Sequence, residues 1–399
     1  MAAPKLPVLV PEAHAIGMIG VIRSLGRAGY TVHALSAQPD ALGFLSSFAA
    51  ASACHPAYDS ADYLPWLLHY LERHHIAAIV PSEAFLLGVR GQIDRIAPLL
   101  PDMPEKATLY RAFSKCDVQE RLLASGSDSM LQHQPRALVV DRGAAPDIEH
   151  LTAAWAWPLF VKTDGLHADH GDSAGVHAAR DPSQLAAYVR DALGTHRRCM
   201  VQEAVPGVKA TVNLWRHRGE IRAQSMALAL HENPYSGGLT SDRVVWWHEA
   251  MAADARQRLE LLEWQGVAMV EYRWDAASGR FWFLELNARY WNALNLDLFA
   301  GKDFPRWQVD AFTGRGVETS MDPGPVGLRA RYTVPAEVGH VLSKCRAPEV
   351  PIADKTATVL GFAANAMRPS IRSDLWFEGD RRLYWHGLRR FVARLGHKS

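Results

Sequence analysis

Two hydrophobic patterns alternate over the first hundred residues. Short apolar runs that are typical of buried strands lie at Pro7–Val10, Thr31–Leu35 and Ile76–Val80. Between the first two runs, Ile16–Tyr30 carries apolar side chains at helical spacing. Because strands that alternate with helices build parallel sheets with helices on their faces, residues 1–106 predict an N-terminal parallel α/β domain.

The pattern changes after residue 106. A helical stretch at Leu109–Ser125 precedes two short strand signals, so residues 107–200 predict a small separate lobe. Strand signals then dominate from Cys199 to Asn287, with one helical interruption. Residues 201–325 therefore predict an α+β lobe built on an antiparallel sheet. The chain as a whole is expected to combine α/β and α+β architecture.

The C-terminal extension, residues 326–399, has weak signals except at its end. Arg381–Ser399 contains six Arg or Lys residues and no acidic residue. Its apolar residues lie on one side of a helix: Tyr384, Trp385, Leu388, Phe391, Val392 and Leu395. This stretch predicts a basic amphipathic helix. Docking against the body of the protein is the favoured interpretation, and contact with a membrane surface is the alternative that stays open.

Composition excludes several classes of protein. The 399 residues are 48% apolar and 21% charged, which is ordinary for a globular protein and unlike a disordered chain. With 43 basic and 42 acidic residues, the net charge of +1 gives no general reason to bind nucleic acid. The four cysteines are far apart in sequence, and no segment is typical of a membrane span or an export signal. A cytoplasmic protein without a disulfide scaffold is expected.

The first turn does not carry a glycine-rich nucleotide fingerprint. It reads PEAHAIG instead of G-x-G-x-x-G, and the chain has no G-x-x-x-x-G-K-[ST] phosphate loop. Ser82 and Glu83 follow the strand that ends at Val80, where α/β sheets place ligands. A carboxylate that binds an amine and a helix N-cap pair explain Ser82 and Glu83 equally well.

The stretch Gly266–Arg289 predicts a hairpin that collects oxygen ligands. Two apolar strands flank the turn AASG, and a turn centred on Ser278 pairs Glu271 with Glu285. The two-residue period of a strand places Asn287 on the same face. Because like charges opposite each other are destabilising, a cation is expected between them, and these ligands suit Mg²⁺ or Mn²⁺. An exposed hairpin with a surface Glu–Arg pair is the alternative, and a one-residue bulge would break the pairing.

These residues resemble the ATP-grasp superfamily, in the branch of carboxylate–amine ligases similar to the large chain of carbamoyl phosphate synthetase. The strongest match is GVAMVEYRWD and FWFLELNARYW, followed by AGKDFP. The resemblance implies an ATP-grasp fold with a pre-ATP-grasp domain, a small central nucleotide lobe and a larger lobe with the antiparallel sheet. It also implies that Glu271, Glu285 and Asn287 hold Mg²⁺ beside the ATP phosphates and that Arg289 is catalytic.

Other pieces of the family pattern follow in order. Lys115 in SKCDVQERLLASG and Lys162 in WPLFVKTDG resemble the two ATP-binding lysines, and the resemblance makes Lys162 catalytic as well. The loop after Lys162 offers glycines that can approach phosphates, and QEAVPG resembles the hinge between the lobes. The nucleotide contacts implied are Lys115, Lys162, Gly171, Gly175, Gln202, Glu203, Val205, Glu271 and Glu285.

The reaction that the resemblance implies is ligation driven by ATP with Mg²⁺ or Mn²⁺. A small-molecule carboxylate would become an acyl phosphate, and an amine would displace the phosphate to form an amide. Two departures support an alternative, an ATP-binding regulatory or scaffolding relative with impaired catalysis. The stretch QSMALAL lacks the basic residue of related sequences, and Asn292-Ala293 replaces their Gly-Ser pair. A thiol acceptor is a further alternative.

Overall fold

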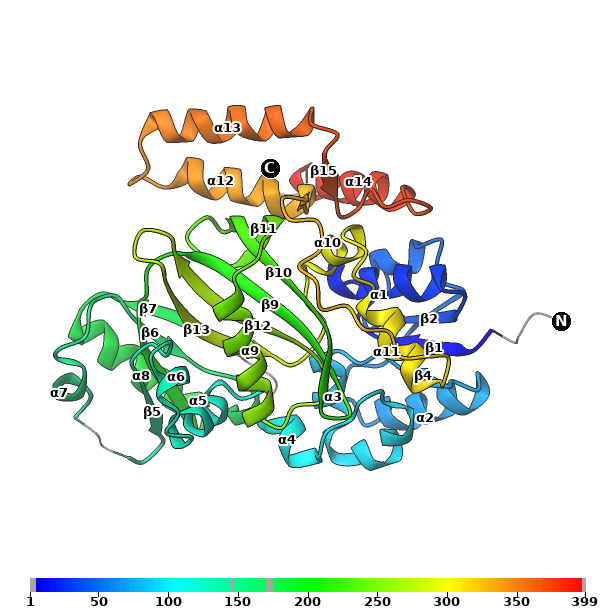
Figure 1. Ribbon diagram of the computed structural model, residues 1–399, viewed down its shortest axis with the longest axis horizontal. Coiled ribbons are helices and arrows are strands. Elements are labelled where there is room, and N and C mark those ends of the chain that lie inside the picture. The colour runs from blue at the N-terminus through cyan, green and yellow to red at the C-terminus, as the bar shows by residue number, and fades with distance from the viewer. Residues whose placement is uncertain (1–4, 145–146, 170–174, 397–399) are drawn as a thin grey trace. The chain divides into compact units, whose positions relative to one another are not determined.

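The computed structural model describes residues 5–144, 147–169 and 175–396 (Figure 1). The chain divides into two compact units, each built from separate stretches of sequence. The first unit comprises Met1–Asp102, Arg222–Trp247 and Arg289–Ser399, and the second comprises Met103–Ile221 and His248–Ala288. The finer division at residues 106, 200 and 325 stays a prediction.

The first unit contains the expected parallel sheet. Its strands have the order β3-β2-β1-β4 and all run parallel: β1 Pro7–Val10, β2 Thr31–Ser36, β3 Ala51–Cys54 and β4 Ala78–Ile79. The connecting helices are α1 Ile16–Arg27, α2 Tyr63–Arg73 and α3 Glu83–Gly88. Gly17 lets α1 approach closely, because a Cβ atom there would lie 2.5 Å from the Trp291 carbonyl oxygen.

Further strands and helices complete the first unit. Strands β10 Glu220–Asn233, β11 Leu239–Val245, β14 Arg329–Arg331 and β15 Ile371–Ser373 pair in that order. The helices here are α10 Leu294–Phe299, α11 Phe304–Phe312, α12 Val338–Arg346, α13 Ile352–Ala366 and α14 Arg382–Gly396. Figure 1 shows α12 and α13 packed side by side. The weak sequence signal after residue 326 did not reveal α12 and α13.

The basic tail folds as the predicted amphipathic helix, α14. Leu383 is fully buried and packs with Leu375, Ile16 and Ile19 in one hydrophobic cluster. Helix α14 is therefore anchored through Leu383, whereas Trp385 and Val392 of the predicted apolar side are 54% and 59% exposed, and the choice between docking and membrane contact for that side stays a prediction. Among the described residues, no helix combines the length and hydrophobicity needed to span a membrane.

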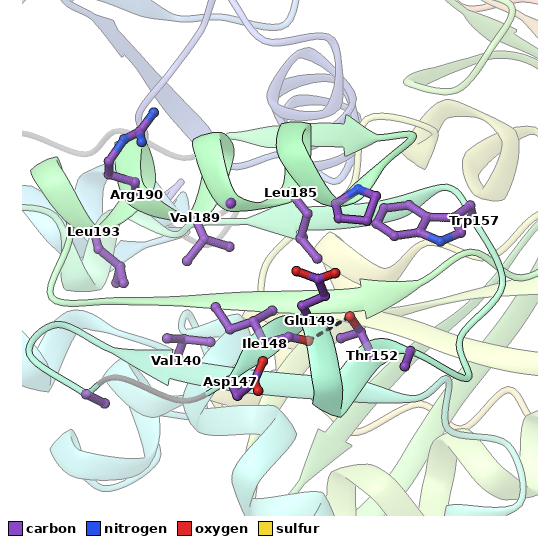
Figure 2. A pocket seen from close by; sticks show the side chains of 14 residues that line it. Val140, Asp147, Ile148, Glu149, Thr152, Trp157, Leu185, Val189, Arg190 and Leu193 are labelled. Carbon is purple, nitrogen blue, oxygen red and sulfur yellow. Dashed lines mark hydrogen bonds between the residues drawn. The ribbon is translucent and has the colours of Figure 1, made fainter.

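The second unit begins with a small antiparallel sheet. Its strands are β5 Ala137–Asp141, β6 Leu159–Lys162, β7 Val176–Ala179 and β8 Arg198–Glu203, in the order β5-β8-β6-β7. Helix α8, Pro182–Thr195, covers one face, where Leu185 and Val189 pack on Leu159 and Val161. A cavity of about 510 Å³ lies on this face, between α8 and α7 (Ile148–Thr152), and Figure 2 shows the side chains that line it.

A second set of paired strands in this unit carries the predicted hairpin. The order is β13-β12-β9, with β9 Val208–His217, β12 Gly266–Asp275 and β13 Arg280–Asn287. Helix α9, Glu249–Leu261, packs on one face, where the Tyr272 hydroxyl donates to Asp254 at 2.6 Å. The remaining helices of the unit are α4 Lys106–Arg111, α5 Lys115–Ala124 and α6 Asp128–Leu131.

Candidate active site

The small sheet turns Lys162 away from its covering helix. Leu159 and Val161 lie in the core under α8, so strand alternation places Lys162 on the opposite face. Gln202 on β8 has the same orientation, because its neighbour Val201 belongs to that core. The Lys162 Nζ donates to Gln202 Oε1 at 2.6 Å, and both side chains are buried. Two residues that the resemblance assigns to ATP therefore share one face of this sheet.

Lys115 stands at the beginning of α5, and a buried carboxylate fixes it there. Ser114 is the N-cap residue, since its Oγ accepts from the Asp117 backbone N–H at 3.0 Å. Asp164 Oδ2 accepts from the Lys115 backbone N–H at 3.0 Å and from Ser114 Oγ at 3.2 Å. A carboxylate is favourable at a helix N-terminus. Asp164, which the sequence analysis did not single out, thus joins the start of α5 to the end of β6, where Lys162 lies.

The hairpin places the two predicted carboxylates opposite each other, but by a different route from the one expected. Asp275 pairs with Arg280, so the turn is centred half a residue earlier than predicted. The register then shifts between Glu271 and the next residue, which makes Leu284 the extra residue of a β-bulge. The bulge brings Glu271 opposite Glu285. The predicted pairing of Glu271 with Glu285 is confirmed. A bulge was expected to break this pairing, but in the structure the bulge creates it.

Lysine and carboxylate side chains gather on the hairpin face that carries these two glutamates. The Lys115 Nζ lies 3.5 Å from Glu285 Oε2, and the Lys209 Nζ lies 3.2 Å from Glu271 Oε1. Asn287 Nδ2 donates to Glu285 Oε1 at 3.2 Å. We call Lys115, Lys162, Lys209, Glu271 and Glu285 the lysine–carboxylate cluster. Lys209 was missed by the sequence analysis, because a single lysine on a strand gives no signal before the neighbouring strand is known.

The lysines of the cluster lower the pKa of Glu285, and its two glutamates oppose the effect of burial on the pKa of Lys162. Burial alone would raise the pKa of Glu285, but Lys115 and Lys162 outweigh burial and lower it from 4.5 to about 2. Burial lowers the pKa of Lys162, while Glu285 and Glu271 oppose that decrease. An ionised carboxylate beside an amide oxygen is a donor set that suits Mg²⁺. Glu271, Glu285 and Asn287 therefore fit the metal that the resemblance implies.

The first two hinge residues of QEAVPG, Gln202 and Glu203, lie on opposite faces of the small sheet. Glu203 is engaged by protein groups, because Arg136 donates to both carboxylate oxygens at 2.5 and 2.7 Å and Ala156 N–H donates at 2.7 Å. The hydrogen bond from Arg136 lowers the pKa of Glu203. Gln202, in contrast, lies beside Lys162. The assignments of Glu203 and Val205 to the nucleotide stay predictions.

The loop after Lys162 is only partly described. Gly171 lies outside the described residues. Gly175 holds the end of the loop, because its N–H donates to Thr163 Oγ1 at 2.9 Å and its carbonyl accepts from the Thr163 N–H at 3.0 Å. His167 Nε2 lies 3.0 Å from both Ser114 Oγ and Asp117 Oδ1. His167 thus belongs to the polar contacts around the start of α5.

The catalytic candidate Arg289 lies in the first unit. Its Nε donates to Glu83 Oε2 at 2.9 Å, and both side chains are about one-third exposed. Ser82 caps α3, since its Oγ accepts from the Phe85 N–H at 3.1 Å. The N-cap explanation of Ser82 is therefore confirmed, whereas Glu83 has a charged partner that the sequence did not suggest.

A second group of charged residues lies in the first unit, around His231 near the end of β10. Arg329 donates to both oxygens of buried Asp242 at 2.8 and 2.5 Å. His231 Nδ1 lies 2.7 Å from Glu337 Oε1, and Glu337 is fully buried. We call Arg329, Asp242, His231 and Glu337 the arginine–carboxylate cluster. Three ligand atoms of His231, Asp242 and Glu337 lie within 4.8 Å of one another, but the bidentate arginine already neutralises Asp242.

Comparison with known proteins identifies the fold. No protein-family model and no curated protein sequence matches the chain. The structure resembles biotin carboxylase from Campylobacter jejuni in complex with β-γ-ATP, at 13% identity and a TM-score of 0.62, over 81% of this chain and 74% of that chain. It also resembles the biotin carboxylase domain of a 2-oxoglutarate carboxylase from Hydrogenobacter thermophilus with MgADP and bicarbonate, at 13% identity and a TM-score of 0.61, over 81% and 73%.

An amino-acid ligase is among the similar structures as well. The L-amino acid ligase from Bacillus licheniformis matches at 14% identity and a TM-score of 0.56, over 78% of this chain and 74% of that chain. Such low identities establish the fold and leave the reaction open. The chain therefore has the ATP-grasp fold that its sequence motifs predicted.

Proposed function

We propose that the protein is an ATP-dependent ligase that activates a carboxylate as an acyl phosphate and joins it to an amine. The observation that carries the proposal is the lysine–carboxylate cluster, in which three lysines and two glutamates meet on one face of the hairpin sheet. Phosphoryl transfer needs little covalent chemistry from the protein and depends on charge neutralisation and alignment. The cluster offers glutamates for the magnesium ion and lysines for the phosphates of Mg-ATP.

The side chains of the cluster can exchange partners when the nucleotide binds. Lys115 and Lys162 would turn from the carboxylates to the phosphate oxygens, and Lys209 offers a third cation. Glu271, Glu285 and Asn287 would hold the Mg²⁺, which neutralises phosphate charge. Mn²⁺ accepts the same oxygen ligands. Because Glu285 stays ionised down to about pH 2, it is ready to bind a cation at any physiological pH.

The first unit supplies candidates for binding the substrates. At the carboxyl ends of β1 and β4, where α/β sheets bind ligands, Glu12 accepts from the Tyr58 hydroxyl at 2.5 Å and Glu83 accepts from Arg289. Glu12 has a φ of +55°, a strained conformation for a residue other than glycine. We assign the two glutamates to the amine substrate and Arg289 to the acyl phosphate, whose oxygens suit its forked guanidinium.

The decisive experiment removes one charge from the cluster. Glu285→Gln keeps the size of the side chain, and calorimetric titration with Mg-ATP should show an affinity at least tenfold lower than that of the wild type, with ADP formation lost. Glu260→Gln, an exposed glutamate on α9, is the matched control and should bind normally. Unchanged Mg-dependent ATP binding by Glu285→Gln would contradict the proposal.

The same assay separates the proposal from an impaired, ATP-binding relative. That second candidate rests on Asn292-Ala293 and on the missing basic residue in β10. We expect ADP formation when mixtures of amino acids and other small carboxylates and amines are supplied. Nucleotide that binds but yields no ADP with any mixture would favour the regulatory relative, whereas ADP formation with thiols alone would favour a thiol acceptor.

A further inference from the structure

A large cavity lies in the C-terminal part of the first unit. It has a volume of about 1060 Å³ and is bounded by β14, β15, α13, α14 and the end of α10. Small-molecule sites commonly enclose about 300–1,000 Å³, so the cavity is as large as the largest of them. All of its lining residues belong to the first unit.

A buried arginine with an unused donor lines this cavity. Arg331 is only 6% exposed, and its Nη1 has no hydrogen-bond partner among the residues that the structure describes. Its guanidinium carbon lies 5.6 Å from the centre of the Phe362 ring. Burial lowers the pKa of Arg331, and the nearby carboxylates of Glu337 and Asp242 oppose this decrease. A buried donor without a partner is costly, so an acceptor that reached this closed-off atom from the cavity, by a shift of the Arg331 side chain, would relieve that cost.

The charge of the lining favours an anion. Five arginines line the cavity against a single acidic residue, Glu378: Arg27, Arg331, Arg368, Arg372 and Arg381. Arg27 is the one of them with a described ion pair, to Asp303 at 3.2 Å. The guanidinium of Arg381 stacks over Trp376 at 5.3 Å, at the outer part of the cavity. Charge-assisted hydrogen bonds from such a group are strong for carboxylate and phosphate oxygens.

The remaining wall is apolar and aromatic. Trp376, Tyr384 and Trp385 meet edge to face, with ring centres 5.4–6.2 Å apart, and Leu388 of α14 lines the cavity beside them. Trp385 is 54% exposed although it lines a cavity. A large aromatic residue on a rim is typical of ligand sites that accept an apolar body.

We propose that this cavity binds a single-tailed anionic amphiphile of the fatty-acid type. The carboxylate head would accept hydrogen bonds from Arg331, and the aliphatic tail would lie against the aromatic wall of β15 and α14. The arginines select the sign of the head group, and the aromatic residues select the apolar tail. This site is separate from the lysine–carboxylate cluster, which belongs to the second unit, so the inference does not depend on the proposed ligase activity.

The test is a calorimetric titration of the full chain with decanoate below its micelle concentration, with tryptophan fluorescence as a second readout. We expect saturable binding of one decanoate per chain, and binding at least tenfold weaker for decanol and for decyltrimethylammonium. Decyl phosphate in place of decanoate shows which anionic head binds more tightly, and tight binding of either supports the site. Equal binding of decanol, or vesicle binding without saturable decanoate binding, would overturn the proposal.

Variants locate the ligand. Arg331→Met should weaken decanoate binding at least tenfold, and Trp385→Ala about threefold to tenfold. Arg389→Met, an exposed arginine of α14 that does not line the cavity, should bind like the wild type. If Arg331→Met fails to fold, Arg381→Met and Trp385→Ala, both at exposed positions, carry the test. Wild-type affinity in both of these would refute the assignment.

Discussion

The two charged clusters contain similar numbers of carboxylates but hold them differently. In the arginine–carboxylate cluster, Asp242 is fully buried and bound by both arms of Arg329. In the lysine–carboxylate cluster, the contacts are single ones at 3.2–3.5 Å, and Glu285 is 26% exposed. A planar guanidinium fixes a carboxylate in one geometry, whereas an ammonium on a flexible stem can exchange partners. The comparison suggests that the arginine at Asp242 has a structural role, whereas the lysines at Glu271 and Glu285 leave these carboxylates ready for a ligand.

The largest expected effect is a loss of stability when the ion pair between Arg329 and Asp242 is broken. Arg329→Met removes both hydrogen bonds of Arg329 from the buried Asp242 carboxylate, which should lower the free energy of unfolding by about 3–5 kcal/mol. Urea denaturation followed by circular dichroism measures it. Arg190→Met, at an exposed pair with Asp191, is the control and should change stability by less than about 0.5 kcal/mol. A similar small loss for Arg329→Met would show that the two clusters do not differ in this way.

Lys162→Met should affect Mg-ATP binding strongly and stability weakly, the reverse of what we expect for Arg329→Met. Burial disfavours the charged form of Lys162, but Lys162 also stabilises the ionised form of Glu285. Because Lys115 still lies 3.5 Å from Glu285, we expect the free energy of unfolding to fall much less than for Arg329→Met. Mg-ATP affinity should fall roughly 10- to 100-fold, since a charge-assisted contact to phosphate is lost. Calorimetry and urea denaturation of the same preparation give both numbers. A large loss of stability with normal ATP affinity would assign Lys162 a structural role instead.

Lys209→Met should also weaken ATP binding more than it weakens the fold, but by a smaller amount than Lys162→Met. Its Nζ contacts Glu271 at 3.2 Å, and we expect Mg-ATP affinity to fall about threefold to tenfold with little change in stability. Lys355→Met on α13 is the matched control, remote from both clusters in sequence. If Lys209→Met binds ATP as tightly as the control, Lys209 serves only to neutralise Glu271.

The smallest effect is a pH dependence. The folded-state pKa of Glu285 is lowered from 4.5 to about 2, so its ionisation stabilises the fold above pH 4.5. That contribution is lost as the pH falls from 4.5 toward 2. Glu285→Gln should therefore show a shallower decline of the urea midpoint than the wild type over this interval. Parallel declines would mean that Glu285 does not titrate with a lowered pKa.

The sequence predicted the parts of the site that lie on regular elements. The two-residue period placed Asn287 on the face of Glu285, because a strand has only two faces, and Asn287 does reach Glu285. Lys209 and Asp164 could not be predicted, since their roles depend on which strand and helix lie beside them. The helices α12 and α13 lay beyond the reach of the pattern. Their sequence signal is weak, and α13 buries almost none of its side chains.

The extra residue at Leu284 has a consequence for the length of chain between the two acids. From the turn to Phe283, the numbers of paired residues add up to 555; from Glu285 onward they add up to 556. Glu271 and Glu285 are fourteen positions apart and meet only because Leu284 is accommodated; without the bulge and with the same turn, the partner of Glu271 would be position 284, thirteen positions away. A deletion that removes Leu284 would thus spare the pairing, whereas the same deletion in the turn would misalign the acids.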